Sequence, residues 1–200
     1  MINETAGIQP SRRWDSVLFL SAGLLMLVNV ALLWVRYYST FQLSILWTAV
    51  PGILGLTASI IGLLTLRLRL SSNMTPWLAR AGAGFALLAA VALCIAAIWI
   101  FSMVLFLGGL SEPTPDAVQT LIGVFVGSVV MAFALNAAAF LVNGSSQTIG
   151  YLLMVPVASW GFMLFVGITS GLQSGLSLDL YANGLIAAAF WGIGFRLKKS

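Results

Sequence analysis

Residues 81–111, AGAGFALLAAVALCIAAIWIFSMVLFLGGLS, lie between Arg80 and Glu112 and contain no charged side chain. An α-helix needs about 20 predominantly apolar residues to cross the hydrocarbon core of a bilayer, so this run is longer than one crossing requires. A transmembrane strand would be about half as long and would alternate apolar with polar residues. The run therefore predicts a membrane-spanning helix that is tilted or that extends beyond the hydrocarbon.

The rest of the chain has the same composition. Of its 200 residues, 60% are hydrophobic and only 7% are charged, whereas soluble domains carry roughly 25% charged residues. We therefore predict an all-α fold, a polytopic transmembrane helix bundle of about six spanning helices that forms a single domain over residues 1–200. The predicted helices cover residues 17–35, 43–66, 81–110, 117–142, 149–168 and 178–195.

The cations predict the orientation of this bundle. Eight of the nine, all except Arg36, fall on one side if the chain crosses the membrane six times: Arg12, Arg13, Arg67, Arg69, Arg80, Arg196, Lys198 and Lys199. Cytoplasmic loops of membrane proteins carry the excess of Lys and Arg. We therefore expect a multi-pass protein of the cell membrane with both termini in the cytoplasm, and no nucleic-acid partner.

Two prolines mark positions along the predicted helices. In Thr75-Pro76-Trp77, a hydroxyl side chain precedes a proline that suits the first position of the third helix. Pro156 instead falls in the body of the fifth run, where a proline removes a backbone hydrogen bond and bends the helix. We expect a kink at Pro156.

Small residues recur at spacings that place them on one face of a helix. The fourth run carries Gly123, Gly127, Ala134 and Ala138. Gly167 lies at the end of the fifth run, and Gly171 and Gly175 follow it at the same spacing. In lipid, small residues promote helix association because they let two backbones approach closely. We expect these faces to pack against other helices of the chain, or alternatively against a partner protein.

Two asparagines, Asn29 and Asn136, lie well inside predicted helices. A buried amide without a hydrogen-bond partner is destabilising. We expect both side chains to form hydrogen bonds between helices; the alternative is that they form the polar lining of a solute path.

The chain lacks the residues on which most catalytic sites depend. It has no histidine, and its five acidic residues are Glu4, Asp15, Glu112, Asp116 and Asp179, none deep in a predicted helix. Without these groups, histidine-based nucleophiles, most metal sites and intramembrane proton relays cannot be built. We therefore expect no catalytic residues, no metal and no cofactor.

Two functions fit these observations. The first is a non-catalytic accessory or structural subunit that binds partner helices, a second copy of itself, or lipid. The second is a small carrier or substrate-binding membrane subunit for an uncharged or apolar solute. The chain is similar in length and number of helices to the substrate-binding subunits of energy-coupling-factor transporters, and that resemblance implies solute binding.

The predicted topology can be tested with reporter fusions. A reporter fused after Ser200 should lie in the cytoplasm, and one inserted near Pro113 should lie on the opposite side, because three helices separate the two positions. If both reporters lie in the same compartment, the number of helices between them is wrong.

Overall fold

The computed structural model contains six α-helices and no strand over the residues that it describes, which are 11–39, 45–70, 76–107, 116–144, 146–170 and 176–199. The helices are α1 (Ser11–Tyr38), α2 (Ile45–Leu70), α3 (Pro76–Leu107), α4 (Asp116–Asn143), α5 (Gln147–Ser170) and α6 (Leu176–Lys199). The predicted helical bundle is confirmed.

Most of these helices are longer than the apolar runs that predicted them. α1 begins six residues before residue 17, and α6 continues four residues past 195, because a helix extends into the headgroup region where charged side chains are solvated. α3 begins at Pro76, as predicted; Thr75 lies outside the described residues, as do residues 43–44 and 108–110.

Five of the six helices are long and apolar enough to cross a membrane, which indicates a multi-pass membrane protein. These are α1, α2, α3, α4 and α6. The surroundings of the last residues of α5 are not described, so its full length is not judged by this criterion.

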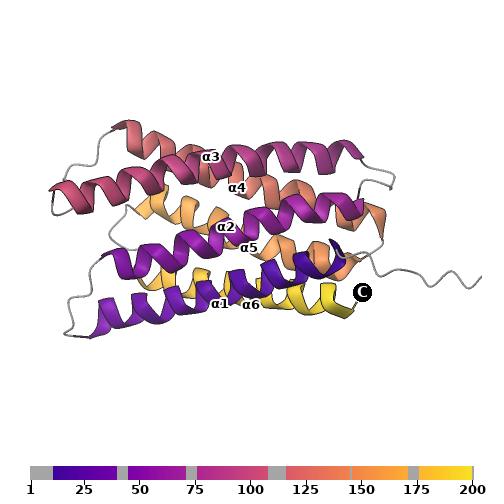
Figure 1. Ribbon diagram of the computed structural model, residues 1–200, viewed down its shortest axis with the longest axis horizontal. Helices are drawn as coiled ribbons and strands as arrows, with labels where there is room; N and C mark the ends of the chain where they lie inside the picture. The colour runs from indigo at the N-terminus through magenta and orange to yellow at the C-terminus, as the bar shows by residue number, and fades with distance from the viewer. Residues whose placement is uncertain are drawn as a thin grey trace, which may run out of the picture.

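The helices run along the long axis of the molecule (Figure 1), and their contacts join them into a closed ring. Each helix packs against the next one in the chain, α6 packs against α1, and α2 also touches α4 across the ring. The beginning of α1 and the end of α6 lie at the same end of the bundle (Figure 1), as an even number of helices requires. We call the half of the bundle nearest these two ends the terminal half, and the other half the far half.

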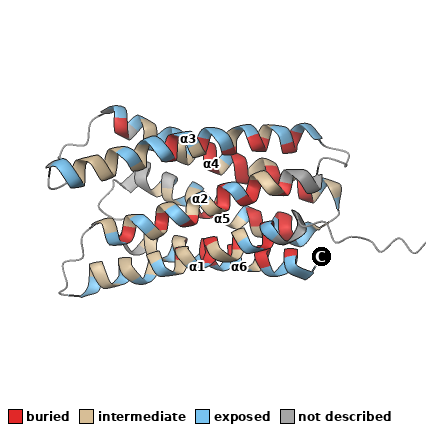
Figure 2. Cartoon of the chain, in the orientation of Figure 1, coloured by how far each residue is buried: buried red, intermediate tan, exposed pale blue. Residues whose placement is uncertain are grey.

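Buried residues are concentrated in the terminal half (Figure 2). Among the described residues, the last buried position is Met26 in α1, Leu93 in α3 and Ser159 in α5. Ile122 in α4 lies about 20° from the buried Phe133 on the helical wheel, yet 47% of its surface is exposed. The helices around Ile122 are therefore less closely packed than those around Phe133, and the described far half contains only scattered buried residues, such as Thr48 in α2, Val118 in α4 and Ala182 in α6.

A row of aromatic rings fills the centre of the bundle and joins four helices. Phe190 (α6) stacks on Phe133 (α4) with ring centroids 5.6 Å apart, and it meets the edge of Phe19 (α1) at 5.9 Å. Trp160 (α5) meets Phe133 at 5.7 Å. Such contacts add about 0.5–1.5 kcal/mol each to the effect of burial.

The aromatic row predicts that Phe190→Ala destabilises the protein. Truncation of a fully buried phenylalanine lowers the free energy of unfolding by about 3–5 kcal/mol. The matched control is Phe195→Ala on the exposed side of the same helix, which should change that free energy by less than about 0.5 kcal/mol. Thermal unfolding in detergent would measure both, and equal melting temperatures would contradict the assignment of the row as the centre of the core.

Candidate functional site

Several glycines in this bundle receive a side chain from a neighbouring helix. We call a glycine a seat where an added Cβ would come within 3.0 Å of such a side chain. Seats occur at Gly23, Gly52, Gly62, Gly82, Gly150 and Gly194, and all except Gly52 lie in the terminal half. At Gly62, for example, the added Cβ would lie 2.8 Å from the ring of Phe19. Backbones approach closely at the seats, and this holds the terminal half together.

Asn136 occupies the seat at Gly82 in α3. Its side chain is 1% exposed, and a Cβ on Gly82 would lie 2.6 Å from its Nδ2 atom. Nδ2 donates a hydrogen bond of 2.8 Å to the carbonyl of Ala132, one turn earlier in the same helix. We expected a hydrogen bond between helices, but the structure shows an intrahelical one and a steric contact with α3. The Oδ1 atom is buried without a hydrogen-bond partner in the described chain.

Asn29 has a similar environment in α1. A Cβ on Gly52 of α2 would lie 3.0 Å from its Nδ2 atom. Its Oδ1 atom is buried and has no hydrogen-bond partner among the described residues. Each membrane asparagine therefore lies against a glycine of the adjacent helix, a partner that sequence analysis did not identify. Both are packed, and neither lines the surface groove described below.

The small residues of α4 behave differently from the seats. A Cβ added at Gly123 or Gly127 would meet nothing within 4 Å, and both residues are exposed. The expectation that these two glycines pack against another helix of the same chain is therefore wrong. Ala138 lies against the hydrophobic core, and Ala134 is half-buried. The alternative, a surface for a partner, stays a prediction.

The remaining predicted residues lie in or after α5. Gly167 is in the last turn of α5 but its surroundings are not described, and Gly171 and Gly175 lie outside the described residues. Pro156 is buried within an otherwise continuous α5, and the kink there stays a prediction.

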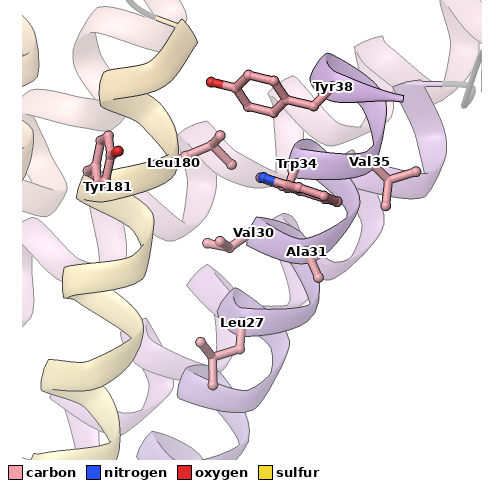
Figure 3. Close-up of a pocket in the computed structure, with 8 residues that line it drawn as sticks. All are labelled: Leu27, Val30, Ala31, Trp34, Val35, Tyr38, Leu180 and Tyr181. Carbon is pink, nitrogen blue, oxygen red and sulfur yellow. The ribbon is translucent and has the colours of Figure 1, made fainter. Parts of the chain in front are cut away.

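A groove of about 690 Å³ runs between α1 and α6 in the far half (Figure 3). The α1 wall consists of Leu27, Val30, Ala31, Trp34, Val35 and Tyr38. The α6 wall consists of Leu180 and Tyr181. None of these side chains is charged. The groove was not predicted, because it depends on the distance between two helices and not on a pattern of residues within one helix.

Two of the acidic residues lie close to helix ends. Asp116 begins α4, and Asp179 lies in the first turn of α6. The positive end of the helix dipole stabilises a carboxylate at these positions. Asp15, by contrast, is buried inside α1 and has a partner. The signal for its burial was present in the sequence, because Asp15 has the helical spacing of Phe19, Ala22 and Met26, all of which face the core.

Comparison with protein families, curated proteins and solved structures finds no match for this chain. The resemblance to the substrate-binding subunits of energy-coupling-factor transporters therefore rests on length and number of helices alone. The function has to be argued from the surfaces described above.

The seat at Gly82 generates a matched pair of substitutions. Gly82→Ala should lower the free energy of unfolding by about 1–3 kcal/mol, because the new methyl group overlaps the amide of Asn136. Two residues away, Gly84 has nothing within 4 Å, so Gly84→Ala should raise stability by up to about 1 kcal/mol through helix propensity. Thermal unfolding in detergent would separate them, and equal stabilisation by both would mean that Asn136 has room to move.

Proposed function

We propose that this chain is a non-catalytic subunit of the cell membrane that binds a partner helix through the Gly123–Gly127 face of α4. The observation that carries the proposal is the open surroundings of these two glycines. Among the described glycines with nothing near an added Cβ, they are the only two that lie four residues apart.

Helix energetics supports this choice. A glycine inside a helix is less favourable than alanine by about 1 kcal/mol. At a seat, close packing with another helix of the chain offsets that loss. At Gly123 and Gly127 the described part of the chain supplies no such contact, and close approach by a helix from another molecule would supply one. A second copy of this chain is one such partner.

The carrier alternative receives less support. A carrier for an uncharged or apolar solute would be favoured by a polar, water-accessible cavity around Asn29 or Asn136. Both amides instead lie against glycines of the adjacent helix, and Asn136 is almost completely buried. The groove between α1 and α6 is on the outside of the ring and contains neither asparagine.

We further infer that both termini lie in the cytoplasm. Arg80, Arg196, Lys198 and Lys199 are exposed at the terminal end of the bundle, together with Trp14 and Trp77. Cytoplasmic loops of membrane proteins carry the excess of Lys and Arg, whereas tryptophan and tyrosine are enriched at both membrane surfaces; the cations therefore support this orientation, and the two tryptophans mark only the depth of a membrane surface. The Gly123–Gly127 face would then lie in the outer half of the membrane.

The proposal predicts that Gly127→Leu separates the chain from its partner and leaves the chain itself intact. The substitution adds a large side chain to the docking face, and it should reduce the amount of co-purified partner or self-associated chain by about tenfold. Because no described residue lies within 4 Å of an added Cβ at Gly127, the free energy of unfolding should change by less than about 0.5 kcal/mol. Pull-down from native membranes and thermal unfolding would measure the two effects.

Gly161→Leu is the matched control, because Gly161 in α5 is also open but has no second open glycine one turn away. It should leave association unchanged. If both variants associate like the wild type, the α4 face contacts lipid and the proposal fails. A large loss of stability in Gly127→Leu alone would show instead that the face packs within the chain.

A further inference from the structure

The groove between α1 and α6 lies beyond the closest contacts of this helix pair. In the terminal half the two helices touch through glycines: Gly23 lies against Trp191, and a Cβ on Gly194 would come within 2.6 Å of Leu20. In the far half the same pair carries Trp34, Tyr38 and Tyr181 along the groove (Figure 3). All three side chains are exposed, so they line an open groove on the surface and do not fill the space between the two helices.

The length of the groove equals one leaflet. From Leu27 to Tyr38 the helix rises about 16 Å at 1.5 Å per residue. Half of a hydrocarbon core is about 15 Å thick. The groove thus covers the depth that one lipid chain occupies in the leaflet opposite the chain termini.

The width of the groove is too small for a helix. Spread over about 16 Å, its 690 Å³ corresponds to a mean cross-section of about 40 Å². A helix with its side chains is about 10–12 Å across and therefore occupies roughly 80–110 Å². The groove is therefore narrower than a helix, and a partner helix, or a helix from a second copy, would contact mainly its rim.

The polarity of the groove follows its depth. Leu27, Val30 and Ala31 form the deep part, which is wholly apolar. The hydroxyl of Tyr38, the indole nitrogen of Trp34 and the hydroxyl of Tyr181 lie toward the other end of the groove, away from Leu27 (Figure 3). These groups donate hydrogen bonds. Arg36 is about 160° from Trp34 and from Tyr38 on the helical wheel, so its charge is directed away from the groove.

We propose that this groove binds one phospholipid of the leaflet opposite the chain termini. One hydrocarbon chain lies along α1, and the oxygen atoms at its head-group end accept hydrogen bonds from Trp34, Tyr38 and Tyr181. Apolar contact alone would not select this lipid from its neighbours, because lipid tails are as apolar as leucine. The hydrogen bonds and the fitted shape provide the preference. This site is separate from the α4 face, and it requires no partner protein.

The test uses the full chain reconstituted in phosphatidylcholine vesicles with a small fraction of phosphatidylcholine that carries a photoactivatable diazirine near the end of one acyl chain. After illumination, mass spectrometry locates the labelled residues. We expect labelling to concentrate at residues 27–31. Val30→Trp, which fills the groove, should reduce this labelling by about tenfold. The control Val91→Trp, on the exposed side of α3, should leave it unchanged.

A second variant keeps the fold and removes only the hydrogen bonds. Tyr38→Phe combined with Tyr181→Phe should lower labelling of residues 27–31 several-fold, by up to about tenfold, given the strength of two hydrogen bonds in a membrane. Tyr151→Phe on the exposed surface of α5 is its control. Uniform labelling of all exposed apolar faces would overturn the proposal, as would wild-type labelling in the double variant. Cross-links at the groove to another protein, or to a second copy, in place of lipid would also overturn it.

Discussion

The structure depends on close approach of helix backbones at glycines. Within a membrane, apolar side chains gain little by leaving lipid for another helix, so packing and shape determine which helices associate. In this chain the seats at Gly23, Gly62, Gly82, Gly150 and Gly194 supply that packing. They lie in the terminal half, and buried residues are concentrated in the same half. The aromatic row from Phe19 to Trp160 fills the space that remains between the helices there.

The helices were predictable because length and hydrophobicity are properties of each run by itself. Packing was not, because it depends on which helix lies opposite. Gly82 and Gly127 look alike in the sequence, as each is a glycine within an apolar helix; only the structure shows Asn136 against one and open space beside the other. The intrahelical bond of Asn136 was missed for a related reason. A hydrogen bond to the carbonyl one turn back needs no second helix, so a buried amide does not by itself predict a bridge.

The contact between α1 and α6 links the core of the protein to its surface. Two seats, Gly23 and Gly194, bring this helix pair together in the terminal half. Further along the same pair, Trp34, Tyr38 and Tyr181 are exposed and line the groove. One helix pair therefore contributes both to the packed part of the bundle and to a groove on its surface. A hydropathy profile shows neither the glycine contacts nor the groove.

The two proposed external contacts share the far half of the bundle and lie on different helices. Gly123 and Gly127 belong to α4, which is on the opposite side of the ring from α1 and α6 (Figure 1). A partner helix on α4 and a lipid between α1 and α6 would therefore not compete for the same surface. The division follows from the positions of the small residues. In the terminal half most of the described glycines contact other helices of the chain, and the open Gly84 has no second open glycine one turn away. In the far half the helices are less fully packed against one another, so an open glycine face and an open groove can exist there. A membrane protein built in this way has one end that maintains the fold and another that is available for binding.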